Sequence, residues 1–135
     1  MTTSLVSLGV LIVLTSSSLL NVTTDIREKL IGKWKWEKVI NKQSGEESGV
    51  EMFTMGMASE VHTEFKSDNT YSESKLRKGE KDFSTVNGEW KLESEDVLSM
   101  KQKEKWNNSK ILKLSGDTLL IEMNKQMNLL MIREK

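Results

Sequence analysis

The segment Leu30-Ile31-Gly32-Lys33-Trp34-Lys35-Trp36-Glu37-Lys38-Val39-Ile40 carries the strongest structural signal in this chain of 135 residues. Apolar and charged residues alternate along it, which places Trp34, Trp36 and Ile40 on one side and Lys33, Lys35 and Glu37 on the other. A period of two is typical of a strand with one buried face. Each tryptophan removes about 150–250 Å² from water when it is buried. We therefore expect residues 30–40 to form the first strand of a β domain whose core assembles around these two indoles.

Short runs of β-branched and aromatic residues, separated by turn formers, follow from Ser59 onward. This spacing predicts a series of short strands joined by tight hairpins. Besides residues 30–40, the expected strands are 59–66, 71–77, 82–92, 97–106, 109–114, 118–123 and 127–133, with a turn at Asn107-Asn108 between strands 97–106 and 109–114. Gly88 lies inside an expected strand and indicates a bend or a bulge.

Eight consecutive hairpin-linked strands are antiparallel to their neighbours, and such a sheet avoids exposed edges by closing on itself. The sequence therefore predicts an all-β, eight-stranded up-and-down barrel. The competing fold is a seven-stranded sandwich, whose crossovers need longer connections than most of those in this chain. Eight strands leave an interior that is either filled by side chains or able to hold one small ligand.

Composition excludes several classes of function. A chain of this length forms one domain, and its 20 basic and 20 acidic residues give a net charge of zero, so we expect no nucleic-acid partner. The absence of Cys excludes disulfides and thiolate metal sites. The single histidine, His62, is expected on the outer face, opposite Val61 and Phe65, with no metal or catalytic role. We expect a protein that is not an enzyme and has no cofactor.

The first 24 residues contain no charged side chain, and residues 5–14 are an uninterrupted apolar run. A run of this length suits a secretory signal better than a membrane span, although no Lys or Arg precedes it. We expect a signal or targeting segment at residues 1–24, a domain at residues 25–135, and a secreted or periplasmic location. The alternatives are membrane or protein-complex association through residues 4–20, and a helix packed on the domain.

Several short motifs resemble one family. Gly32-Lys33-Trp34 is similar to the Gly-x-Trp signature of lipocalins, and residues 65–71 (FKSDNTY) resemble the Phe-x-x-Asp-Gly-Thr-Tyr hairpin of small bacterial lipocalin-like (calycin) domains, with Asn69 in place of Gly. Residues 88–92, 111–114 and 130–133 follow in the order found in those domains. The resemblance covers about residues 30–134. It implies a lipocalin-like barrel whose floor contains Gly32 and Trp34, with Arg133 stacked on the indole.

A barrel of this kind binds ligands through its inward-facing side chains. The expected lining residues are Trp36, Phe65, Tyr71, Trp90 and Met100. Phe53 belongs to a methionine-rich segment, residues 50–57, that forms either an adaptable lid over a ligand or a loop packed on the rim. The leading hypothesis is a non-enzymatic module that holds a small apolar or amphipathic molecule. The alternative is a structural or interaction protein with a packed barrel that docks on a larger extracytoplasmic or membrane-associated assembly.

Overall fold

The computed structural model describes residues 24–135, so the expected targeting segment lies almost wholly outside the described residues. Residues 24–30 are helical and lead directly into the first strand. None of the helices in this described range is long and apolar enough to cross a bilayer. The remaining elements are β1 (Gly32–Asn41), β2 (Glu47–Gly49), α2 (Val50–Phe53), β3 (Glu60–Phe65), β4 (Thr70–Leu76), β5 (Ser84–Ser94), β6 (Val97–Gln102), β7 (Lys105–Ser115), β8 (Thr118–Glu122) and β9 (Met127–Arg133).

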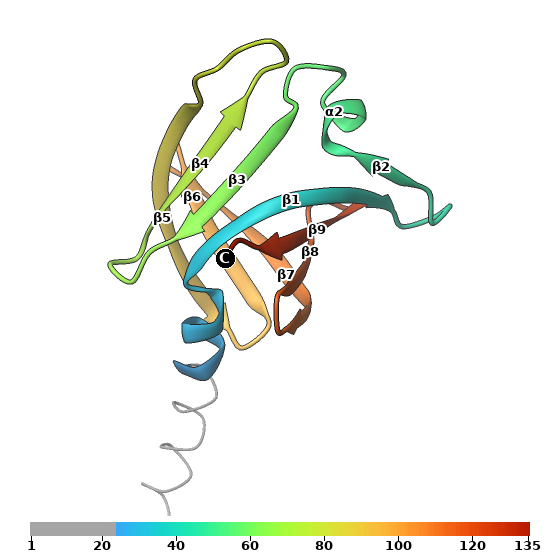
Figure 1. Cartoon of the computed structure of the whole chain (residues 1–135). Helices are drawn as coiled ribbons and strands as arrows, with labels where there is room; N and C mark the ends of the chain where they lie inside the picture. Colours follow the sequence, from blue (N-terminus) through green and yellow to red (C-terminus); the bar gives the residue numbers. More distant parts are fainter. Residues whose placement is uncertain (1–23) are drawn as a thin grey trace, which may run out of the picture.

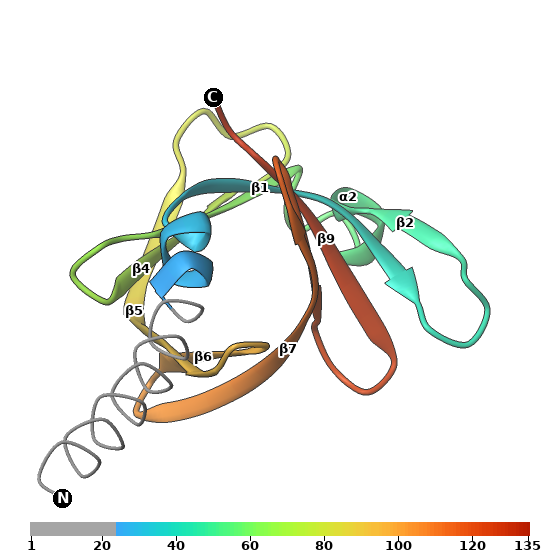
Figure 2. The ribbon, with the colours of Figure 1, turned by 90° about the horizontal axis from the view of Figure 1, so that it is seen from below.

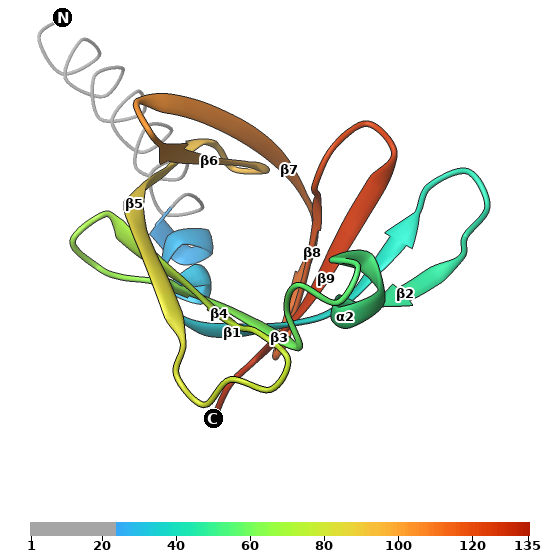
Figure 3. The same cartoon turned by 90° about the horizontal axis from the view of Figure 1, so that it is seen from above.

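The strands form one antiparallel sheet in the order β2-β1-β3-β4-β5-β6-β7-β8-β9, and β1 also pairs with β9. This second pairing closes eight strands into a barrel, around which the chain runs up and down (Figures 1 and 3). The predicted eight-stranded barrel is confirmed. Within residues 24–135, closure leaves the short strand β2 as the edge of the sheet, and a single closed sheet excludes the competing sandwich.

The first strand departs from simple alternation at one point. Its pairing with β9 shifts by one residue between Trp36 and Lys38, which makes Glu37 a β-bulge. The bulge reverses the phase, so Val39 is buried in the core, whereas the prediction placed Ile40 on that face. Beyond the barrel β1 also pairs with residues 47–49 of the short strand β2.

The hairpin between β6 and β7 also differs from the prediction. The chain turns at Lys103 and Glu104, which both have positive φ (52° and 67°), rather than at Asn107-Asn108. A two-residue hairpin loop with two positive φ values matches the right-handed strand twist, and it usually contains Asn or Gly. Because neither residue type occurs at 103–104, no local signal predicts this turn. Asn107 and Asn108 are instead consecutive residues inside β7.

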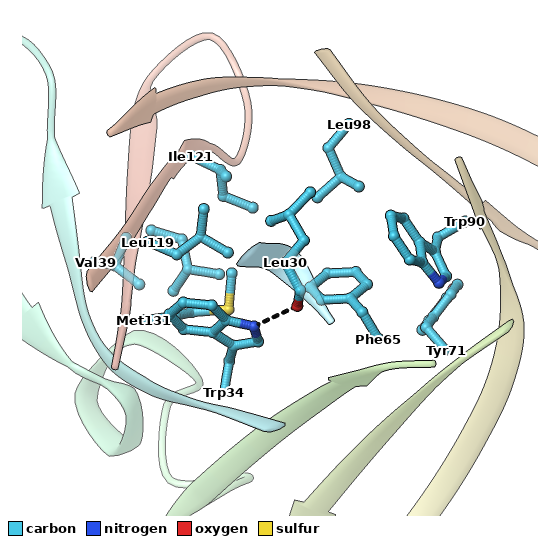
Figure 4. Close-up of a cluster of buried hydrophobic side chains, with 11 residues drawn as sticks. Leu30, Trp34, Val39, Phe65, Tyr71, Trp90, Leu98, Leu119, Ile121 and Met131 are labelled. Atoms are coloured by element: carbon cyan, nitrogen blue, oxygen red, sulfur yellow. Dashed lines mark hydrogen bonds between the residues drawn. The ribbon is translucent and has the colours of Figure 1, made fainter. Parts of the chain in front are cut away.

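Large apolar side chains from most strands meet inside the barrel (Figure 4). The buried cluster consists of Leu30, Trp34, Val39, Phe65, Tyr71, Trp90, Leu98, Leu119, Ile121, Leu129 and Met131. We call the end where residues 24–30 lie the closed end, and the opposite end, where α2 and residues 77–83 lie, the open end (Figures 1 and 2). Inward-facing side chains at the closed end are buried, whereas several at the open end are exposed.

Candidate functional site

The closed end is built around Trp34, which is fully buried. Its indole Nε1 donates a hydrogen bond of 2.9 Å to the carbonyl of Leu30, where the helical segment ends. The guanidinium of Arg133 lies 4.3 Å from the indole centroid and donates to the Ile31 carbonyl. Gly32 makes this approach possible, because a Cβ there would lie 2.6 Å from Arg133 Nη1. These residues cover the bottom of the barrel.

A second indole extends the same packing. Trp90 lies edge to face with Phe65, with ring centroids 5.3 Å apart, and its Nε1 donates to the Lys66 carbonyl. The guanidinium of Arg27 lies 4.7 Å from the Trp90 ring. Both aromatic residues were expected to line a ligand space, and the structure places them within the closed-end packing at 1 % exposure.

Tyr71 marks the boundary between the two ends. Its ring lies across Gly88, where a Cβ would approach the ring to 2.5 Å, and its hydroxyl donates to the Lys101 carbonyl at 3.2 Å. The register between β4 and β5 is continuous through this pair, so Gly88 forms no bulge with β4 and instead makes room for the phenol ring. Burial, and secondly the carboxylate of Glu73, raise the pKa of Tyr71.

Strand register assigns the inner wall above Tyr71. Because Tyr71 points inward, alternation also directs Glu73 and Lys75 inward, and their cross-strand partners Val86 and Ser84 share that face. Val86 is nevertheless 41 % exposed. An inward apolar side chain in contact with water shows that the barrel interior is unfilled at this point.

Strand register also identifies inward-facing residues on β6 and β7. Met100 pairs with Trp90 on one side and with Asn107 on the other, so both Met100 and Asn107 face inward. Met100 is partly buried against the core, whereas Asn107 is exposed. We call Glu73, Lys75, Val86, Met100 and Asn107 the mouth wall. It combines an ion pair of 3.7 Å between Lys75 and Glu73 with an amide and two apolar side chains.

The opposite side of the open end is apolar and packed. Trp36 is partly buried, and its Nε1 donates to Thr63 Oγ1 at 3.0 Å. Against it pack Val50, Ala58 and Val61, which fixes the α2 segment to the rim. Phe53, the last residue of α2, packs against the main core. The methionines of this segment point away from it, as the exposures of Met52, Met55 and Met57 show (75 %, 90 % and 66 %).

The expected lining residues therefore divide between the two ends. Trp36, Phe53 and Met100 lie at the open end. Tyr71 lies below them, at the boundary, and Phe65 and Trp90 lie in the packing of the closed end. The polar members of the mouth wall, Glu73, Lys75 and Asn107, were missed because a polar residue in a strand normally indicates the outer face. For Glu73 and Lys75 the available signal was a spacing of two and four residues from Tyr71.

Comparison with known proteins agrees with this architecture. The family model of the lipocalin-like domain matches residues 30–121, which is more than half of the chain. A lipocalin-like protein from Bacteroides uniformis has a similar structure, with a TM-score of 0.61 at 18 % identity over 78 % of this chain and 99 % of the other. An uncharacterized protein from Bacteroides eggerthii gives 0.60 at 10 % identity over the same shares. No curated protein matches the sequence. By its family match, the chain belongs to the lipocalin-like domain family.

Proposed function

We propose that this protein is a non-enzymatic binding module that holds a small amphipathic molecule at the open end of its barrel. The observation that carries this proposal is the 41 % exposure of Val86 at an inward-facing position. Natural cores fill inward positions to high density, and an unfilled inward surface is where a ligand gains the most apolar burial.

The mouth wall indicates an amphipathic ligand rather than a purely apolar one. Val86, Met100 and the ring of Tyr71 offer apolar surface to the buried part of the molecule. Glu73, Lys75 and Asn107 offer charged and amide groups at the same level or above, where a polar head group stays hydrated. A purely apolar ligand would remove these groups from water without replacing their hydrogen bonds, which costs binding free energy.

The test is direct binding to the full chain. Native mass spectrometry of the gently purified protein detects a co-purified molecule. A titration then compares anionic, cationic and neutral head groups, using anilinonaphthalene sulfonate, a long-chain fatty acid, an alkyl trimethylammonium salt and a neutral monoacylglycerol. We expect saturable binding of at least one of these probes, with quenching of tryptophan fluorescence. An apo mass together with no saturable binding of any probe contradicts the proposal.

The neighbouring asparagines of β7 provide a matched pair of variants. Asn107→Trp places an indole in the mouth, whereas Asn108→Trp places the same indole on the outer face of the same strand. We expect Asn107→Trp to weaken probe binding at least about tenfold, equivalent to about 1.4 kcal/mol, and Asn108→Trp to leave it unchanged. Equal effects of the two variants place the bound probe outside the mouth.

One observation favours an alternative function. Much of the interior is filled, and Met52, Met55 and Met57 present flexible, polarizable side chains to solvent on one loop, as adaptable protein-binding surfaces do. Under this alternative the barrel is a scaffold and the loop docks on a larger assembly. Under this alternative, replacing the three methionines by Gln abolishes binding of the partner assembly and leaves probe binding unchanged. Under the leading proposal, probe binding depends on Asn107.

We further propose that the protein is exported, since the uncharged apolar segment at residues 4–20 suits a targeting signal or an anchor. Fractionation of the cells that produce it tests this proposal. The mature protein is expected in an extracytoplasmic fraction, and deletion of residues 1–24 is expected to retain it in the cytoplasm. Equal distribution of the two forms contradicts export through this segment.

A further inference from the structure

A second hollow lies on the outside of the barrel, separate from the mouth. It has a volume of about 290 Å³, at the lower limit of small-molecule sites, and it lies on the outer face of β1, β3 and β4. Its floor is a cross-strand row in which Lys33 pairs with Glu64 and Glu64 with Ser72. Because these side chains project from paired strands, their spacing is fixed by the sheet.

An aromatic ring forms one wall of this outer hollow. Phe83, the residue before β5, folds back over the sheet and packs edge to face against His62, with ring centroids 5.4 Å apart and an interplanar angle of 72°. It remains 45 % exposed. A phenyl ring held by a neighbouring side chain, yet open to solvent beside polar groups, offers an apolar platform to a ligand that also has hydrogen-bonding groups.

The polar groups around the ring are held in place. His62 contacts Glu60 at 3.3 Å through Nε2 and contacts Glu134 through Nδ1, so both ring nitrogens are engaged. The hydrogen bond to His62 lowers the pKa of Glu60. Ser72 Oγ donates to Asn87 Oδ1 at 2.9 Å, which leaves the oxygen lone pairs of the serine to accept from a ligand. Preorganised groups reduce the entropy lost on binding.

The charges that line the hollow nearly balance. Lys33 supplies a donor, Glu64 an acceptor and Ser72 a hydroxyl, while His62 and Glu134 bond to each other. Within residues 24–135, neither Lys33 nor Glu64 has an ion-pair partner within 4.0 Å, and no group of three His, Asp or Glu side chains there is arranged to hold a metal ion. A balanced set of donors and acceptors favours an uncharged ligand with many hydroxyl groups over an ion.

We propose that this outer hollow binds a neutral sugar of monosaccharide size, whose C–H face lies on Phe83 and whose hydroxyl groups bond to Glu64, Ser72 and Lys33. Sugars combine an apolar ring face with a ring of donors and acceptors, which is the combination that the hollow presents. The site uses the outer face of the sheet, so it does not depend on the ligand proposed for the mouth.

The single histidine makes the test selective, because it gives one set of imidazole signals in the nuclear magnetic resonance spectrum. The full chain is titrated with neutral hexoses and their methyl glycosides, and with glycine and inorganic phosphate as charged probes of similar or smaller size. We expect at least one sugar to shift the His62 imidazole and Phe83 ring signals saturably, and the charged probes to leave them unchanged.

Two variants separate the outer hollow from other sugar-binding surfaces. Phe83→Ala is expected to weaken sugar binding at least about fivefold, since an aromatic contact of this kind contributes about that factor. The control, Trp106→Ala, removes another part-exposed aromatic residue, which Lys91 contacts at 4.3 Å, and is expected to change nothing. No saturable shift with any sugar, larger shifts with glycine or phosphate, or equal effects of the two variants would overturn the proposal.

Discussion

The closed and open ends of the barrel are built from the same strands but fill their inward positions differently. At the closed end the inward residues are large and apolar, and Trp34 and Trp90 each bond through the indole nitrogen to a backbone carbonyl. At the open end, inward positions of β4, β5 and β7 hold Glu73, Val86 and Asn107. Alternation alone therefore determines which way a side chain points, but not whether that side chain is buried.

This contrast assigns different tasks to the two ends. Packing free energy is concentrated where side chains interlock without voids, so the closed end carries most of the stability of the barrel. The mouth wall adds little to stability, because its members remain hydrated. Such a division leaves the open end free to vary in sequence while the fold is maintained, which suits a binding module.

The two tryptophans of β1 are expected to contribute very different amounts to the free energy of unfolding. Trp34→Ala removes a fully buried indole and is expected to lower the free energy of unfolding by about 3–5 kcal/mol. Trp36→Ala, on the partly exposed side of the open end, is expected to cost about 1–2 kcal/mol. Urea unfolding followed by circular dichroism measures both. Similar losses for the two variants would show that stability is not concentrated at the closed end.

Two glycines, one at each end of the barrel, are expected to differ in the cost of a substitution. Gly32→Ala combines a φ of +135° with a contact of 2.6 Å to Arg133 Nη1, and is expected to cost about 2–3 kcal/mol. Gly79→Ala, in the loop at the open end, has a φ of +84° but no atom within 4 Å of the new Cβ, so only backbone strain of about 1–2 kcal/mol is expected. The difference in cost between Gly32→Ala and Gly79→Ala should shrink when Gly32→Ala is combined with Arg133→Ala. An unchanged difference assigns the cost to the backbone alone.

The predictability of the molecule follows the same division. The barrel could be predicted because alternation and turn residues are local signals, and they repeat eight times. The bulge at Glu37 and the turn at Lys103-Glu104 could not, because residues without a special preference for these conformations adopt them under the demands of strand pairing. The polar members of the mouth wall were missed for a related reason, because a polar residue in a strand indicates the outer face, whereas the register across β4, β5 and β7 places these residues inward.

A polar substitution at matched inward positions has a smaller expected effect at the mouth. Val86→Ser is expected to change the free energy of unfolding by no more than about 0.5 kcal/mol, because the side chain is already in contact with water. Leu98→Ser, at a fully buried inward position, is expected to lower the free energy of unfolding by more than about 2 kcal/mol. Thermal unfolding compares the two, and probe titration is expected to show weaker binding for Val86→Ser only. A large stability loss for Val86→Ser means that the mouth is packed in solution.

A modest pH dependence is expected from Tyr71, the only tyrosine, which lies between the two ends. Its pKa is raised above the ordinary value of 10.0, first by burial and then by Glu73. The folded state therefore favours the neutral phenol, whose contribution to stability is complete below pH 10.0 and is lost as the pH rises through the folded-state pKa.

Ultraviolet absorbance of the phenolate measures this titration directly. The midpoint is expected above pH 10.0 in the native protein, and Glu73→Gln is expected to lower it while leaving it above the unfolded value, because burial is the larger cause. A bound amphipathic molecule excludes water from the ring and is expected to raise the midpoint further. If saturating probe leaves the midpoint of Tyr71 unchanged, then the ligand rests on the rim alone, and the boundary between filled and unfilled barrel lies above Tyr71.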